Sequence, residues 1–156
     1  MRIRIIAVGE RMPRWVDEVV EDYTRRVSGS LKLIWTQVPA AQRGARTATT
    51  QAQQIEAQRL LALIKPQEFV VALDERGAQP ATREFAAWLA GRLNDGRDLS
   101  FVIGGPDGLA EEVLARASYR LSLSKLTLPH PLVRVVLAEQ LYRAHTVLSG
   151  HPYHRE

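Results

Sequence analysis

The feature that most constrains this chain lies in its last third, where two apolar strands each run into a loop and then into a helix. The apolar run at 99–103 passes directly into the glycine-rich stretch GGPDG at 104–108 and then into a short helix that ends near 117. A second predicted strand at 119–123 continues into a nearly uncharged loop and a long apolar helix at 132–148. This order is typical of α/β sheets, whose ligands bind at the loops that follow the carboxyl ends of strands.

The rest of the chain continues the alternation of strands and helices. Apolar runs predict strands at 2–8, 31–38 and 68–73, and helical spacing predicts helices at 15–27, 51–64 and 81–93. The small, polar and basic stretch 40–50, with Arg43 and Arg46, is typical of a mobile loop. We therefore expect a mostly parallel sheet with helices on both faces. The 156 residues show no repeat and no linker, so residues 1–156 are expected to form a single domain.

Composition sets the limits on partners. The chain has no cysteine, which excludes disulfides and Cys-ligated metals. Its net charge is +4, and all but three of the 21 basic residues are arginine. A solvated basic surface and a phosphate-facing patch both explain this charge, but arginine favours RNA because it binds phosphate bidentately and stacks on bases. The apolar run at 5–8 is too short for a signal peptide and no segment approaches membrane-spanning length, so we expect a cytoplasmic protein with no membrane partner.

The glycine-rich stretch 104–108 fits the phosphate-binding motifs poorly. No Lys-Ser/Thr pair follows it, as a P-loop requires, and its spacing is not the dinucleotide fingerprint. It is either a tight strand-to-helix turn or a site where backbone groups hold a ligand. A ligand such as S-adenosylmethionine suits the second interpretation, because its sulfonium and adenine need little anionic recognition. A side chain at Gly105 would then occupy ligand space.

All four histidines lie from the second loop onward. Pro129 and Pro131 restrict the backbone around His130, so its ring has a fixed direction beside the expected pocket, whether its role is structural or chemical. The terminal HPYHRE at 151–156 is a frayed end, half a zinc site or a substrate-facing tail. Two histidines without cysteine fall short of a zinc ligand set, so no metal site is expected. Aromatic and arginine side chains suit an RNA base and its phosphate.

The helix at 132–148 is apolar on most of its circumference. A helix that is apolar all round must be covered all round, whereas an outer helix of a small α/β domain keeps one face toward solvent. We therefore expect a partner subunit to cover the remaining face, and a two-fold homodimer is the default arrangement.

Several of these segments together resemble one family. They are RIIAVGERMPRWV at 4–16, RGAR at 43–46, GGPDGL at 104–109, LSLSKLTLPHPLVRV at 121–135 and HPYHRE at 151–156. In this order and spacing they are similar to the ribosomal RNA large-subunit methyltransferase H family, a minimal branch of the SPOUT class of S-adenosylmethionine-dependent RNA methyltransferases. The resemblance covers nearly the whole chain. It implies a SPOUT-type α/β fold with a C-terminal trefoil knot, in which residues 121–134 thread through an earlier loop.

The resemblance also implies a reaction and a set of site residues. The implied reaction is methylation of N3 of a pseudouridine in the 23S ribosomal RNA of the assembled ribosome, by a homodimer that uses S-adenosylmethionine. The family's cofactor contacts correspond to Leu73, Gly104, Gly105, Leu123, Ser124, Lys125, Leu126, Thr127 and Leu128. The base must lie in line with the methyl group and its imide proton must be lost. The candidates for this chemistry are His130, Tyr153, His154 and Arg155, with Arg134 and Arg143 as further cations.

Two other functional classes stay open. A non-catalytic RNA- or ribosome-binding α/β protein would need the basic surface but no cofactor pocket, so tight binding of S-adenosylmethionine would exclude it. A Rossmann-like nucleotide enzyme would need a phosphate cradle, which the glycine-rich stretch does not provide.

Overall fold

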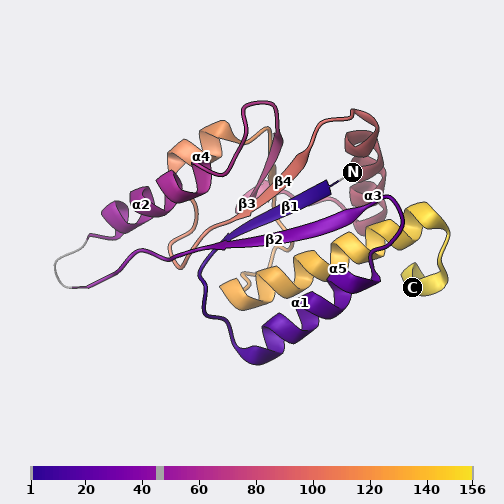
Figure 1. The fold of residues 1–156 in the computed structure, drawn as a ribbon, viewed down its shortest axis with the longest axis horizontal. Helices are drawn as coiled ribbons and strands as arrows, with labels where there is room; N and C mark the ends of the chain where they lie inside the picture. Colours follow the sequence, from indigo (N-terminus) through magenta and orange to yellow (C-terminus); the bar gives the residue numbers. More distant parts are fainter. Residues whose placement is uncertain (1, 45–47, 156) are drawn as a thin grey trace.

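The computed structural model describes residues 2–44 and 48–155 (Figure 1), so Arg46 and Glu156 lie outside the described residues. The strands are β1 (Arg2–Val8), β2 (Lys32–Val38), β3 (Phe69–Ala78), β4 (Leu99–Ile103) and β5 (Tyr119–Leu121). The helices are α1 (Arg14–Arg26), α2 (Thr49–Leu61), α3 (Thr82–Asn94), α4 (Glu111–Arg116) and α5 (His130–Ser149), followed by the short 3-10 turn η1 (Pro152–His154). The predicted alternation of strands and helices is confirmed.

The five strands form one parallel sheet in the order β2-β1-β4-β3-β5. β4 lies at the centre, and every one of its residues is buried. This position explains the mostly apolar run at 99–103, which only Ser100 interrupts, because a central strand of a parallel sheet is covered on both faces.

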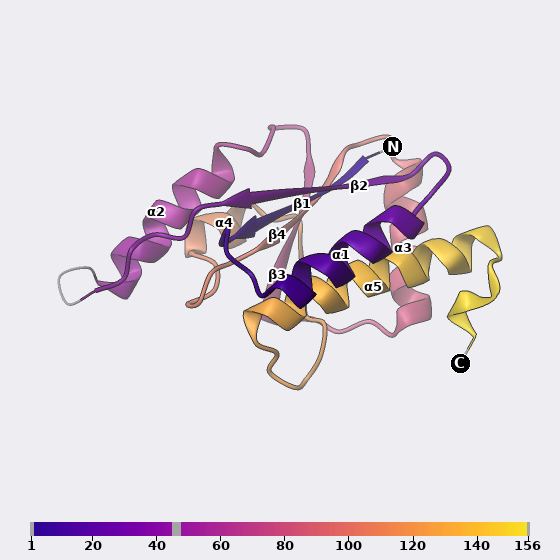
Figure 2. The same cartoon turned by 60° about the horizontal axis from the view of Figure 1, so that its bottom comes forward.

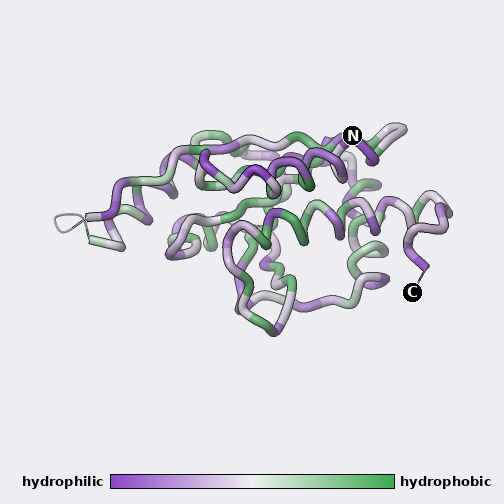
Figure 3. The backbone as a smooth tube through the Cα atoms, turned by 90° about the horizontal axis from the view of Figure 1, so that it is seen from below, coloured by the Kyte–Doolittle hydropathy of each residue, from purple (hydrophilic) through white to green (hydrophobic). Residues whose placement is uncertain are grey.

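Helices cover both faces of the sheet, as Figures 1 and 2 show: α1, α3 and α5 lie on one face and α2 and α4 on the other. Side chains of β1 alternate between two cores. Ile3 and Ile5 pack with residues of α3 and α5, whereas Ile6 and Val8 pack with residues of α2 and α4. Along α5, hydrophobic residues recur on successive turns (Figure 3).

α5 begins at His130, two residues earlier than predicted, because Pro131 fits the first turn of a helix, where no backbone donor is needed. The helix ends at Ser149 and is capped by Gly150, whose φ of 75° places it in the left-handed region that favours glycine. α2 also differs: it ends at Leu61, ahead of Pro66, rather than at 64.

β3 ends five residues later than predicted, at Ala78 rather than at 73, because its last residues pack around the end of β5. Leu121 of β5 pairs with both Leu73 and Ala78 of β3. A Cβ atom on Gly77 would lie 2.6 Å from the backbone carbon of Arg120, so only glycine allows this approach. The chain that leaves β5 therefore passes tightly against residues 73–78. Threading of residues 121–134 through an earlier loop stays a prediction.

α5 is covered by its own chain to a larger extent than its composition suggested. It packs against α1, α3 and η1, and its buried residues include Leu137, Leu141 and Tyr142. Only Leu132 and Leu148 are exposed large apolar residues on the helix. The homodimer therefore stays a prediction, and most of the apolar circumference has an explanation within one chain. Among the described residues, no helix is long and apolar enough to cross a membrane.

Candidate active site

A cleft of about 1270 Å³ opens at the carboxyl ends of four strands. Val8 of β1, Leu73 of β3, Ile103 of β4 and Leu121 of β5 all reach its wall. Its volume exceeds the roughly 300–1,000 Å³ of most small-molecule sites. The cleft therefore has room for a cofactor and for part of a second molecule beside it.

Nearly all of the residues that the resemblance assigned to the cofactor line this cleft. They are Leu73, Gly104, Gly105, Leu123, Ser124, Leu126, Thr127 and Leu128. Lys125 does not line it, and its side chain is exposed. The lining part of the 123–128 loop is therefore free of charged side chains, as the sequence indicated.

The first two glycines of the cofactor loop (residues 104–108), Gly104 and Gly105, are required by close packing. A Cβ atom on Gly104 would lie 2.6 Å from the backbone carbon of Gly108, within the loop itself. A Cβ atom on Gly105 would lie 2.9 Å from Oε1 of Glu56 and 3.1 Å from Val8 Cγ1. A side chain at Gly105 would therefore press against the carboxylate of α2 and the end of β1, and its entry into ligand space stays a prediction.

His130 lines the cleft, and its ring is engaged by the protein. Its Nε2 accepts a hydrogen bond from Nε of Arg134 at 3.1 Å, and the backbone carbonyl of Gly104 is a hydrogen-bond acceptor for the ring. Burial lowers the pKa of His130, and the nearby positive charge of Arg134 lowers it further. The lowered pKa favours the neutral form of the ring, which lies between the cofactor loop and α5. This geometry suits a structural role, in which the ring holds the two segments together, better than proton transfer.

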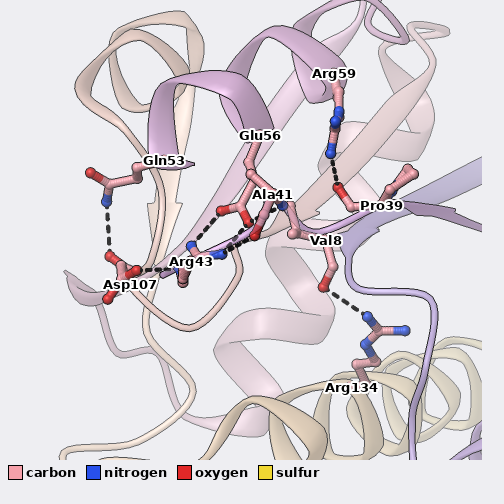
Figure 4. A network of polar contacts seen from close by, with 9 residues as sticks. All are labelled: Val8, Pro39, Ala41, Arg43, Gln53, Glu56, Arg59, Asp107 and Arg134. Carbon is pink, nitrogen blue, oxygen red and sulfur yellow. Dashed lines mark hydrogen bonds and ion pairs between the residues drawn. The ribbon is translucent and has the colours of Figure 1, made fainter. Parts of the chain in front are cut away.

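Arg134 is a buried residue that ties α5 to the end of β1. Its Nη2 donates to the carbonyl oxygens of Val8 at 3.0 Å and Gly9 at 2.7 Å, and Figure 4 shows the contact with Val8. Burial lowers the pKa of Arg134, while the negative charge of Asp17 opposes this effect. The guanidinium of Arg134 thus donates hydrogen bonds to Val8, Gly9 and His130 of its own chain. The sequence alone had allowed this residue to be a cation available to the substrate.

The tail lies at the other end of α5. The hydroxyl of Tyr153 donates to Glu139 at 3.1 Å, and its ring centroid lies 4.6 Å from that of Tyr142. Burial raises the pKa of Tyr153, and the contacts with Tyr23 and Glu139 raise it further. The phenol therefore stays protonated and is a poor base in this position.

None of the three tail candidates lines the cleft of its own chain. His154 is partly buried, with an Nδ1 atom that has no hydrogen-bond partner among the described residues, and Arg155 is exposed. α5 has 20 residues and separates the tail from the cleft. At about 1.5 Å per residue a helix of this length spans roughly 30 Å. The structure therefore brings the cofactor residues and His130 together and leaves the tail apart.

A family model described as "Predicted SPOUT methyltransferase" matches residues 1–154. The chain belongs to the SPOUT methyltransferase family. It is 49% identical to the ribosomal RNA large subunit methyltransferase H of Thiobacillus denitrificans, over 100% of both chains. It is 46% identical to the protein of the same name from Ectopseudomonas mendocina, over 99% of this chain and 100% of that one.

Solved structures agree on the SPOUT fold. A probable methyltransferase from Bordetella pertussis superposes with a TM-score of 0.58 at 18% identity, covering 92% of this chain and 93% of its own. A probable methylase family protein from Haemophilus influenzae gives a TM-score of 0.56 at 14% identity, over 99% of this chain and 70% of its own. At these identities the likeness concerns the fold alone.

Two acidic residues beside the cofactor loop of this SPOUT protein were missed by sequence reasoning. Glu56 of α2 is 2% exposed, and Asp107 lies within the loop. Glu56 carried a detectable signal, because it stands one helical turn from Ala52 and Leu60 on the buried side of α2. A carboxylate in such a position must have a partner. Among the described residues, no group of three or more His, Asp or Glu is placed to hold a metal ion.

Proposed function

We propose that this SPOUT protein transfers a methyl group from S-adenosylmethionine to large-subunit ribosomal RNA. The observation that carries the proposal is the cleft at the strand carboxyl ends, walled by a glycine loop and an uncharged loop. Relatives that match over the full chain at 46–49% identity are named ribosomal RNA large subunit methyltransferase H. The finer proposal is that N3 of a pseudouridine in the 23S RNA of the assembled ribosome is the target, which places the protein in the cytoplasm.

The cleft fits S-adenosylmethionine by the chemistry of its lining. Leu73, Leu123 and Leu128 supply apolar surface for the adenine, and the cofactor loop supplies backbone groups at close range. Asp74, next to Leu73, is nine-tenths buried, and its Oδ2 accepts no hydrogen bond from the described residues. This atom lies 3.9 Å from Nη1 of Arg120, and a buried acceptor without a hydrogen bond suits the hydroxyl or ammonium donors of this molecule. When bound, the cofactor supplies an electrophilic methyl group.

The residues around the cleft act by holding its walls in place. His130 and Arg134 link the cofactor loop, the end of β1 and the start of α5 into one unit. A pre-formed wall fixes the direction in which a bound base meets the methyl group, and methyl transfer depends on that alignment. We therefore assign His130 to positioning rather than to removal of the imide proton.

We assign the substrate-facing groups to the tail of a second protomer. In its own chain the tail lies about one α5 length from the cleft, roughly 30 Å. A two-fold homodimer would bring the tail of one protomer to the cleft of the other. There the cationic side chains of Arg143 and Arg155 would stabilise the imidate as the base gives its N3 proton to solvent water, and Tyr153 or His154 would stack on the base.

The cofactor assignment is tested by calorimetric titration with S-adenosylmethionine, S-adenosylhomocysteine and ATP. Binding of the first two without the third supports the cofactor assignment. No binding of S-adenosylmethionine would instead favour a non-catalytic ribosome-binding protein, and binding of ATP alone would favour a nucleotide enzyme.

The substrate is tested by methyl incorporation into assembled ribosomes, isolated large subunits and protein-free ribosomal RNA. Mass spectrometry of nuclease digests then locates the methylated nucleotide. Incorporation into N3 of a pseudouridine in assembled ribosomes alone is the expected result. Equal methylation of protein-free RNA, or a methyl group on another atom, would contradict the finer proposal.

A further inference from the structure

Glu56 is a buried carboxylate with both oxygens occupied. Its Oε2 accepts from the backbone N–H of Ala41 at 3.0 Å and from Nη1 of Arg43 at 2.7 Å. Its Oε1 accepts from Nη2 of Arg43 at 2.9 Å. This bidentate ion pair compensates the buried negative charge of Glu56, which would otherwise be strongly unfavourable. It also holds residues 41–43 against α2.

The third guanidinium nitrogen of Arg43 reaches the cofactor loop. Its Nε donates to Oδ2 of Asp107 at 2.7 Å, and the side chain of Gln53 donates to the carbonyl oxygen of Asp107 at 2.8 Å. Figure 4 shows Arg43 between the two carboxylates, with α2 on one side and the loop on the other. The hydrogen bond with Glu56 raises the pKa of Arg43, and that with Asp107 adds to the effect.

Gly105 of the same loop packs directly on this ion pair. A Cβ atom there would lie 2.9 Å from Oε1 of Glu56, so the loop rests on the carboxylate with no side chain between them. The position of Glu56 therefore decides how close residues 104–108 approach α2, and Arg43 holds Glu56 from the opposite side.

We propose that Arg43 is a positioning residue for the cofactor loop and is not a phosphate contact. The inference rests on the proposed S-adenosylmethionine site. The basic stretch 40–50 invites an RNA-binding interpretation, yet every nitrogen of the Arg43 guanidinium donates to a protein acceptor, Nη1 also to the carbonyl of Ala41 at 3.1 Å. A loop held in its binding shape in advance loses less conformational freedom when the ligand arrives.

Asp107→Ala is the first test, because it cuts the link to the loop and leaves the buried pair intact. The Arg43–Asp107 contact is partly exposed, with side chains 24% and 32% accessible. Contacts of this kind contribute at most about 1 kcal/mol, so we expect the Kd for S-adenosylhomocysteine to rise about threefold to fivefold. Arg59→Met is the matched control, because Arg59 ties α2 to the carbonyl of Pro39 without touching the loop. Its Kd should stay within about twofold of the unchanged protein.

Arg43→Met combined with Glu56→Gln is the second test, since the pair of substitutions leaves no unpaired buried charge. The Kd for S-adenosylhomocysteine should rise about tenfold or more, because the loop then loses both the Arg43–Asp107 contact and the ion-paired carboxylate of Glu56 against which Gly105 packs. Adding Asp107→Ala to this variant should raise the Kd no further, since the contact is already gone. The salt dependence of ribosome affinity, measured at fixed magnesium, should keep its slope.

The outcomes separate this inference from the proposed function. Failure of the unchanged protein to bind S-adenosylhomocysteine would overturn the proposed function and this inference with it. A Kd of Asp107→Ala that equals the Kd of the unchanged protein would overturn the positioning role alone. A preserved Kd together with a salt slope reduced by about 0.7–0.9 in Arg43→Met/Glu56→Gln would show that Arg43 binds phosphate.

Discussion

The two ends of α5 hold different kinds of functional group. At the start of the helix, His130 and Arg134 are bound to backbone groups of β1 and the cofactor loop and help to shape a cleft. At its end, Tyr153 packs against Tyr142 and Glu139 on the surface of the same helix and faces no cleft of its own chain. The comparison teaches that the residues proposed for the cofactor come together within one chain, whereas the tail residues proposed for the RNA base lie away from the cleft of that chain.

Removal of the tail is the change with the largest expected effect on this comparison. Deletion of the residues from Tyr153 onward should lower methyl incorporation into ribosomes by at least about 100-fold, since alignment of the base is lost. The Kd for S-adenosylhomocysteine should stay unchanged, because the tail does not line the cleft. Full turnover by the truncated protein would show that the tail has no part in the reaction.

Mixing two inactive proteins sharpens this prediction. A tail-deleted protomer keeps its cleft, and a Gly105→Val protomer keeps its tail. If the tail serves the partner's cleft, heterodimers of the two should regain methylation. Continued inactivity in a mixture shown by native mass spectrometry to contain heterodimers would mean that the tail serves the cleft of its own chain.

Gly105→Val is the next largest change, and it affects only the cleft end. The new side chain would press on Glu56 and Val8, and overpacking of this kind costs roughly 1–3 kcal/mol. The Kd for S-adenosylhomocysteine should rise by at least about 100-fold as the loop is pushed from its position. Calorimetry and thermal unfolding check both effects. Gly91→Ala on α3, where nothing lies within 4 Å of the new Cβ, is the control and should change neither.

His130→Ala distinguishes a positioning role of His130 at the start of α5 from a role as general base. If His130 is a positioning residue, its loss should raise the Kd for S-adenosylhomocysteine about tenfold and lower kcat at saturating cofactor by less than that. Loss of a general base would instead lower kcat by about 100-fold to 10,000-fold with little change in Kd. His130→Asn, which keeps a donor and an acceptor, should recover part of the affinity.

The smallest expected effect is on the pH dependence of stability at the two ends of α5. Burial lowers the pKa of His130, which faces Arg134 and Glu56, and burial also lowers the pKa of His145, which faces His151. Both histidines therefore take up protons at a lower pH in the folded protein than in the unfolded chain, which takes up protons below about pH 6.5. The unfolded state then binds more protons, so stability should fall as the pH falls below that value, by at most about 1.4 kcal/mol per pH unit for each histidine.

Single variants show which end of α5 causes this loss. Denaturant unfolding between pH 5 and pH 8, about one unit and a half on either side of the ordinary histidine pKa, gives the free energy of unfolding at each pH. His130→Ala and His145→Ala should each flatten the decline below pH 6.5. An unchanged slope in both variants would place the titrating groups elsewhere in the chain.

Much of the cleft could be predicted because its residues are neighbours in sequence. The glycine stretch 104–108 and the loop 123–128 each follow a strand, and parallel strands deliver their following loops to the same edge of the sheet. Proline on both sides of His130 also indicated correctly that its ring has a fixed direction. The role of that ring could not be predicted, since its partner Arg134 is identified only when α5 packs beside the end of β1.

The sequence by itself determined the α/β class, the order of the elements and the loops that line the cleft. Local apolar spacing reports burial and element type, and those properties depend on near neighbours. Only the tertiary structure decided that Glu56 supports Gly105, that Arg43 joins α2 to Asp107, 64 residues along the chain, and that the tail stands apart from its own cleft. Such contacts depend on strand order and helix packing, which no local pattern encodes.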